Sequence, residues 1–138
     1  MNILGGRVTR FEAKRIEDNA TESIGLNIDV KDVSNESKVV KIVYSSKISY
    51  VPNVAEISVD GELVIDFENE QKAKEMVESF KKEKRLPTGV AEEVIQAINY
   101  SATSVGTMAA FAIGLGAPIS IPKVKISEVK PGATPKAG

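Results

Sequence analysis

The stretch AEISVDGELVIDFENEQKAKEMVESF (residues 55–80) changes its apolar period once, and that change decides the fold. Over residues 57–67 the apolar side chains, except Val64, occupy odd positions, which predicts a strand with one buried face. Over residues 73–80 apolar side chains recur at helical spacing, and most other positions are charged. Asn69 is a favourable N-cap between the two segments. The stretch therefore predicts a strand followed directly by an amphipathic helix.

The Asp60-Gly61 pair inside this stretch has two interpretations. Asp-Gly between alternating apolar runs is typical of a tight hairpin turn. A glycine within one long strand can instead mark a bulge. The odd positions stay in phase across the glycine, but a two-residue turn would also preserve pairing, so the alternation leaves both interpretations open.

Three further strands are expected before this stretch, over residues 8–16, 26–30 and 40–50. Each shows at least a partial alternation of apolar and polar side chains. Polar or turn-forming residues separate them, at residues 17–23, 32–37 and 52–53. Four consecutive strands with short connections predict an antiparallel sheet.

A second, longer helix is expected over residues 89–114, after the break at Leu86-Pro87. Its apolar stripe includes Val94, Ile98, Val105 and Ala109. Small residues in the same helix permit close approach by another helix or by a sheet: Ala102, Gly106, Ala109 and Ala110.

The chain carries no charge over residues 94–122, a run long enough to cross a bilayer. Seven Asn, Gln, Ser and Thr side chains interrupt the run, and nine of its other residues are Ala or Gly. These features favour a helix buried in a core or a subunit interface over a membrane span.

The predicted fold is an α+β domain over residues 1–127, with a four-stranded antiparallel sheet followed by two helices and an extended C-terminal segment. Ile119, Ile121, Val124 and Ile126 of that segment are available to dock, and a flexible Pro/Gly/Lys tail is expected over residues 128–138. Helices on one face leave the other face and both edges of the sheet unburied. We therefore expect a homo-oligomer, with an interface at Val94, Ile98, Val105 and Ala109.

The residue types present argue against catalysis. The chain has no His and no Cys, which removes the usual general base, the common nucleophile dyads and thiolate metal sites. Ser79 and Lys82 match a Ser-x-x-Lys pattern, but they lie on the charged side of the first helix rather than in a cleft. We expect no enzyme activity, no cofactor and no metal; a carboxylate-bound metal is the weaker alternative.

The net charge and the first ten residues indicate which partners and which location to expect. The formal net charge of -1 gives no field that would draw the chain to nucleic acid or an anionic membrane. Residues 1–10 have neither the basic segment nor the apolar run of a signal peptide, so a cytoplasmic location is expected.

One set of apolar side chains on the sheet remains to be explained: Tyr44, Ile48, Tyr50, Leu63, Ile65 and Phe67. They either form the core beneath the helices or line an exposed binding groove. The sequence pattern favours a core position for most of these side chains, but a sheet with limited helical cover can contain both a core and an exposed groove.

The order of these elements resembles that of the SecB-like protein-export chaperones. The segment FEAKRI (11–16) looks like the first strand of that family, residues 26–30 like the second, and AEISVDGELVI (55–65) like the fourth. The Leu86-Pro87 stop and the segment APISIP (117–122) are similar to its C-terminal half. The resemblance covers about residues 7–126, and it favours one continuous strand across Gly61.

The resemblance implies an ATP-independent holdase, usually a tetramer, that binds unfolded polypeptides in apolar grooves and is linked to protein export. Carried over to this chain, the groove residues would be Tyr44, Tyr50, Leu63, Ile65, Phe67 and Phe111. The Lys-rich tail differs from the C-terminus with which SecB meets the export motor, so hand-off to that ATPase is not expected. The alternative is a non-catalytic structural or adaptor oligomer whose apolar surfaces serve self-assembly.

Overall fold

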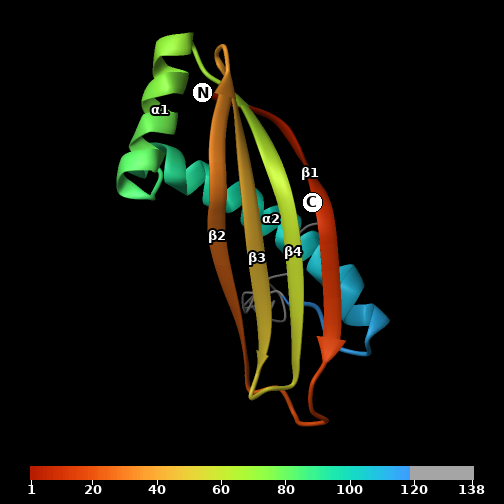
Figure 1. Cartoon of the computed structure of the whole chain (residues 1–138). Coiled ribbons are helices and arrows are strands. Elements are labelled where there is room, and N and C mark those ends of the chain that lie inside the picture. The colour runs from red at the N-terminus through yellow and green to blue at the C-terminus, as the bar shows by residue number, and fades with distance from the viewer. Residues whose placement is uncertain (119–138) are drawn as a thin grey trace, which may run out of the picture.

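A computed structural model, which describes residues 1–118, shows a curved antiparallel sheet with two helices (Figure 1). The elements in chain order are β1 (Asn2–Arg15), β2 (Ser23–Glu36), β3 (Val39–Val51), β4 (Ala55–Asp66), α1 (Glu70–Glu83) and α2 (Thr88–Ala112). The α+β class and the order of four strands and two helices are therefore confirmed.

The strands lie in the order β1-β4-β3-β2, and every neighbouring pair is antiparallel. β2, β3 and β4 form a meander of two hairpins, whereas β1 pairs with β4 across the sheet. β1 and β2 are consequently the two edge strands.

β4 is one continuous strand through Asp60 and Gly61, so the hairpin alternative is wrong. The bulge lies on the partner strand, where the pairing of β1 with β4 shifts at Thr9, between Val8 and Arg10. Gly61 serves a different purpose. A Cβ at Gly61 would lie 2.5 Å from the Tyr44 hydroxyl and 2.7 Å from the Arg7 carbonyl oxygen, so the missing side chain makes room for the buried Tyr44 ring.

Two strand boundaries differ from the prediction. β1 begins at Asn2 rather than near residue 8. β2 continues through residues 32–36, which the sequence had suggested as a turn. A register shift at Lys31 explains the second error, because burial passes from Ile28 and Val30 to Val33 and the alternation breaks there.

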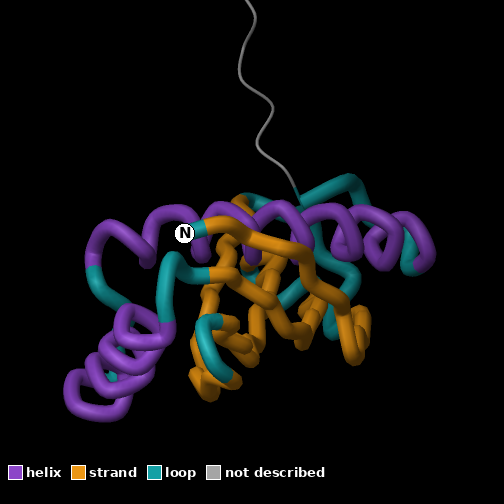
Figure 2. The backbone as a smooth tube through the Cα atoms, turned by 90° about the horizontal axis from the view of Figure 1, so that it is seen from above, coloured by secondary structure: helices purple, strands orange, loops and turns teal. Residues whose placement is uncertain are grey.

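α1 follows the sequence prediction closely. The Asn69 side chain accepts a hydrogen bond from the Lys72 amide at 2.9 Å and caps the helix. Ala73, Met76, Val77 and Phe80 are buried, as their spacing predicts. The helix packs beside β2 and β3 at one end of the sheet (Figures 1 and 2).

α2 crosses one face of the sheet diagonally and contacts all four strands (Figures 1 and 2). Its buried residues are Val94, Ile98, Ala102, Gly106, Ala109 and Ala110. The small residues therefore allow close approach to the sheet: a Cβ on Gly106 would lie 2.5 Å from Ile48 Cδ1 on β3. No helix within residues 1–118 is long and apolar enough to cross a membrane.

The predicted extended segment with Ile119, Ile121, Val124 and Ile126 lies outside the described residues, as does the tail over residues 128–138. The chain between α2 and Pro118 is held by side chains of the sheet. The Arg15 guanidinium donates to the Ile113 carbonyl oxygen at 3.0 Å, and the Tyr50 hydroxyl donates to the Gly116 carbonyl oxygen at 2.7 Å.

We predict that Gly61→Ala lowers the free energy of unfolding by about 1–3 kcal/mol, because the new methyl group overpacks the Tyr44 ring. Urea denaturation followed by circular dichroism measures the change. Gly25→Ala is the matched control, since Gly25 also lies in a strand but a Cβ there meets nothing within 4 Å. Equal effects of the two substitutions would contradict the packing explanation.

Candidate functional site

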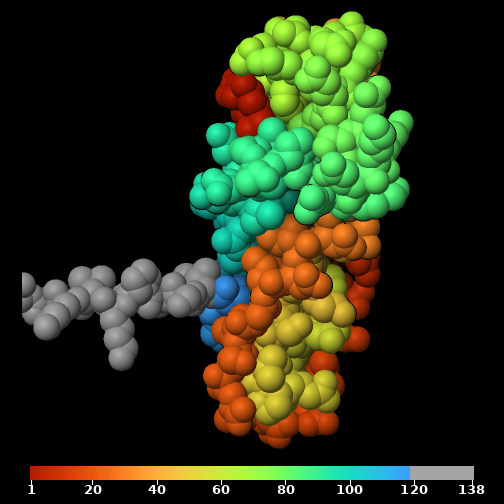
Figure 3. Space-filling model, turned by 90° about the vertical axis from the view of Figure 1, so that its left-hand side faces the viewer, coloured from red at the N-terminus to blue at the C-terminus, as the bar shows by residue number. Residues whose placement is uncertain are grey.

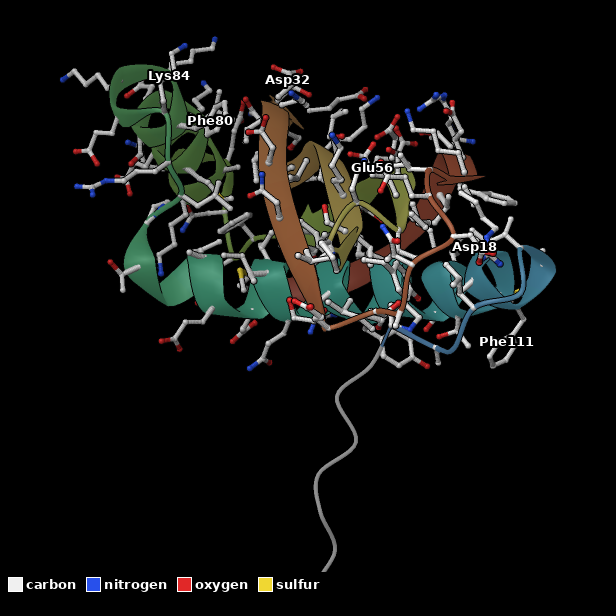
Figure 4. The ribbon with its side chains drawn as sticks, turned by 90° about the horizontal axis from the view of Figure 1, so that it is seen from below. Asp18, Asp32, Glu56, Phe80, Lys84 and Phe111 are labelled. Carbon is white, nitrogen blue, oxygen red and sulfur yellow. The ribbon has the colours of Figure 1, made fainter. Side chains whose placement is uncertain are left out.

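The sheet face that α2 leaves uncovered is charged (Figure 4, where Asp32 and Glu56 point away from α2). Acidic side chains of β4 lie between basic side chains of β1 and β3. The ion pairs join Glu62 to Arg7 (2.7 Å) and Lys41 (3.7 Å), Asp60 to Arg10 (3.3 Å), and Glu56 to Lys14 (3.7 Å) and Lys47 (3.9 Å). This face is suited to contact with water, because paired charged side chains run along it.

The opposite face contains most residues that were predicted to bind a client. Tyr44, Tyr50, Leu63, Ile65 and Phe67 are each at most 8% exposed. They lie beneath α1 and α2 because the even positions of β3 and the odd positions of β4 point to the covered face. The structure therefore places these five side chains in the core of the chain instead of in an open groove.

Burial also sets the chemistry of the two tyrosines in this set. It raises the pKa of the Tyr44 phenol, against a smaller lowering by a hydrogen bond with Ser101, and it raises the pKa of the Tyr50 phenol. Both phenols consequently stay protonated at neutral pH. Tyr50 is thus a permanent donor to the Gly116 carbonyl oxygen.

The predicted interface residues fall into two groups. Val94, Ile98 and Ala109 are enclosed between α2 and the sheet of the same chain, so they have almost no surface to offer a second chain. Val105 is half-buried and lies beside Phe11 and Met108 in a depression of about 480 Å³ between α2 and β1.

Phe111 differs from the other predicted client-binding residues because it lies on the outer face of α2 and points away from the sheet (Figure 4). It is 64% exposed, and Tyr100 and Met108 on the same helix are 76% and 74% exposed. Residues 94–112 of the helix carry no charge, and a helical surface that displays three large apolar side chains to solvent is suited to association.

Two depressions follow the edge strand β2. One, of about 700 Å³, is lined mainly by residues 21–26, with Ile48, Asn99, Thr103 and Pro118. The other, of about 860 Å³, lies between β2, the C-terminal end of α1 and the first turns of α2; its apolar lining is Ile28, Val30, Phe80, Leu86, Ala91 and Ile95. We call the first the lower pocket, the second the upper pocket, and both together the edge groove.

Figure 3 looks at this edge, with β2 in orange, α2 in teal and α1 in green. Ile24 and Leu26 pair with Tyr50 and Ile48 of β3. Paired residues share a face of the sheet, so both side chains point to the side covered by α2. Because β2 is the last strand, they remain partly exposed, and Leu26 is 38% accessible.

The sequence did not single out this groove. Leu26, Ile28 and Val30 were recognised as one face of a strand, but their position at an edge depends on the strand order. That order is fixed by the pairing of β1 with β4, which no alternation of residues reveals.

No arrangement for metal binding is present within residues 1–118, where no three acidic side chains gather at one point. The absence of enzyme activity stays a prediction from the sequence.

Comparison with known proteins gives one informative result. No family model matches the chain, and no curated protein is similar to it in sequence. Among solved structures, it is similar to a SecB-like chaperone of Mycobacterium tuberculosis, with a TM-score of 0.54 over 90% of this chain and 87% of that one. The fold is SecB-like. The two sequences are 12% identical, and the mycobacterial protein was solved in complex with a ChAD peptide from the HigA1 antitoxin.

We predict that Leu63→Lys unfolds the chain, whereas Phe111→Lys leaves it folded. Leu63 is in the core, and a buried unpaired charge costs about 3–5 kcal/mol; Phe111 is exposed, and a surface substitution changes stability by about 0.5 kcal/mol or less. Thermal denaturation of the two variants measures the difference. If the Leu63→Lys chain stays folded, Leu63 is not in the core, and it lines an open groove instead.

Proposed function

We propose that this chain is an ATP-independent holdase that binds extended segments of unfolded polypeptides in the edge groove. One observation carries the proposal: β2 is an edge strand whose apolar side chains are followed by two pockets on the side of α2. The proposal therefore assigns client binding to Leu26, Ile28 and Val30 of β2 and to Ile95 of α2, instead of the residues predicted from the sequence.

The main chain of β2 supports this proposal. An edge strand has a row of amide and carbonyl groups that no neighbouring strand satisfies. An extended client can pair with these groups whatever its side chains are, which suits a protein that must accept many sequences. The pockets beside the strand then favour clients with apolar side chains.

The two edges of the sheet are not equivalent. The pairing of β1 with β4 shifts twice, near Leu4 and at Thr9, whereas β2 keeps one register from Ser23 to Val30. Bulges twist an edge and interrupt the pattern that a new strand would follow. β2 is therefore the better template for strand addition.

The SecB-like fold also supports the proposal of polypeptide binding. The similar mycobacterial chaperone binds a peptide, and the same class of ligand is proposed here for this chain. Hand-off to an export ATPase is not part of the proposal. A cytoplasmic location stays a prediction.

The outer face of α2 supports the second function considered, that of a structural oligomer. Tyr100, Met108 and Phe111 are exposed there, and residues 94–118 carry no charge. We propose that copies of the chain associate through this face. Because it lies on the far side of α2 from the sheet, association through it is compatible with a free edge groove.

We predict that Leu26→Glu weakens binding of an unfolded client at least about tenfold, which corresponds to about 1.4 kcal/mol. The charge lies in the lower pocket, where an apolar client side chain would bind. Suppression of the aggregation of chemically denatured citrate synthase, without ATP, measures the effect. Phe11→Glu is the matched control, an exposed apolar residue on the other edge. If wild-type protein does not suppress aggregation, or if Phe11→Glu is the more damaging change, the proposed groove is wrong.

We predict that the double variant Met108→Lys, Phe111→Lys dissociates the oligomer and leaves the fold intact, because two charges would face each other across the contact. Light scattering gives the mass before and after the change. Leu4→Lys is the control, since Leu4 is a similarly exposed apolar residue on β1. Dissociation by Leu4→Lys alone would move the interface to the β1 edge.

A further inference from the structure

A hydrogen bond at the end of the β3–β4 pair shows which way the main chain of β3 faces. The Phe67 amide donates to the Lys38 carbonyl oxygen at 2.9 Å. In an antiparallel pair, directly opposed residues are hydrogen-bonded at every second position. The pairing of β3 with β4 has no register shift. The even-numbered residues of β3 therefore bond to β4, and its odd-numbered residues bond to β2.

The same alternation extends to the edge strand β2. From Ser23 to Val30, β2 keeps one register against β3, with Gly25 opposite Ser49. Because Ser49 is an odd-numbered residue of β3, the odd-numbered residues of β2 are the ones that bond to β3. Within residues 1–118, no strand lies on the other side of β2. The residues whose amide and carbonyl groups point to this free edge are Ile24, Leu26, Ile28 and Val30.

The side chains of these four residues point to the edge groove. Each lies opposite an even-numbered residue of β3, and the even-numbered residues of β3 are on the face that α2 covers. Ile24 and Leu26 line the lower pocket, and Ile28 and Val30 line the upper pocket. One set of residues thus supplies both the free hydrogen-bonding groups and the apolar side chains of the groove.

The bulge at Lys31 ends this arrangement. The pairing of β2 with β3 shifts there, so that Asp32 lies opposite Val43, an odd-numbered residue of β3. Beyond the bulge, the even-numbered residues of β2 therefore bond to β3, and the free groups move to odd positions. A strand added along the free edge loses its register after Val30. The regular template consequently spans residues 24–30.

We propose that a client adds to residues 24–30 as an antiparallel strand whose first, third, fifth and seventh residues provide both the hydrogen bonds and the side chains in the groove. In an antiparallel pair, hydrogen-bonded residues lie directly opposite each other and share a face of the sheet. The preferred client is thus a seven-residue segment with apolar residues at alternate positions. This specificity rests on the proposed function, because it describes which polypeptides the edge groove selects.

The second, fourth and sixth residues of the client would lie on the face that α2 leaves uncovered. Their neighbours on β2 are Gly25, Asn27 and Asp29, and Asp29 is paired with Lys31 at 2.7 Å. A Cβ at Gly25 would meet nothing within 4 Å, so there is room for a client side chain beside it. These polar surroundings suit polar client residues. An amphipathic strand therefore fits the site better than a uniformly apolar one.

The direction of the added strand follows the rest of the sheet. All three pairs of neighbouring strands are antiparallel, and antiparallel pairing is slightly more stable per residue than parallel pairing. The direction decides which client amides are needed. A parallel strand with the same side chains in the groove would bond to β2 through its second, fourth and sixth residues instead.

Two isomeric peptides test this arrangement with the full chain. Both have the sequence Val-Thr-Leu-Lys-Val-Thr-Leu and a fluorophore at the N-terminus. The first carries N-methyl groups on its second, fourth and sixth residues, and the second carries them on its third, fifth and seventh, so composition and charge are equal. We expect the first peptide to bind at least about tenfold more tightly, because the second lacks three amides that antiparallel pairing needs. Fluorescence anisotropy measures both affinities.

Variants of the chain locate the bound peptide. Leu26→Glu should weaken binding of the first peptide at least about tenfold, whereas Phe11→Glu, on the opposite edge, should leave it unchanged. Equal affinity for the two peptides, tighter binding of the second, or no effect of Leu26→Glu would overturn the proposal. If neither peptide binds while the chain suppresses the aggregation of citrate synthase, the proposed strand pairing is wrong and the holdase function stands. If the chain also fails to suppress aggregation, both are wrong.

Discussion

Gly106 lies at the point where α2 crosses β3, and a side chain there would collide with Ile48. This close approach depends on a row of small residues, with Ala102 and Ala109 one turn away on either side. It allows one helix to cover all four strands of a long sheet. The covered face of the sheet and the exposed outer side of the helix both follow from that contact.

The face of the sheet that α2 does not cover is exposed to solvent, and no second layer of helices or strands covers it within residues 1–118. Acidic side chains on β4 are paired with basic side chains on both neighbouring strands, so this face is stable against water. Within residues 1–118, most exposed large apolar side chains lie along the edge strands and on α2. A binding function has to use one of these places, and the edge groove is the larger concave surface.

Residue periodicity predicted the element types well, because burial on one face is a local property of a strand or helix. Asn69 and the stripe from Ala73 to Phe80 predicted α1 almost to the residue. Periodicity also indicated that Tyr44, Leu63 and Leu26 each lie on the apolar face of their own strand. It could not show which of the three lies at an edge, since this depends on β1 joining β4. The bulge at Lys31 concealed half of β2 for the same reason: the shift is a property of the pairing with β3.

The pairing of β1 with β4 also has a consequence for how the chain is made. β2, β3 and β4 can form their hairpins as they leave the ribosome, because their contacts are local. β1 is synthesised first, yet Asn2 finds its partner only when Asp66 has emerged. Until then β1 is itself an unfolded segment that carries large apolar side chains, Leu4 and Phe11 among them. Each new copy is therefore, for the first half of its synthesis, a chain of the kind that finished copies would bind.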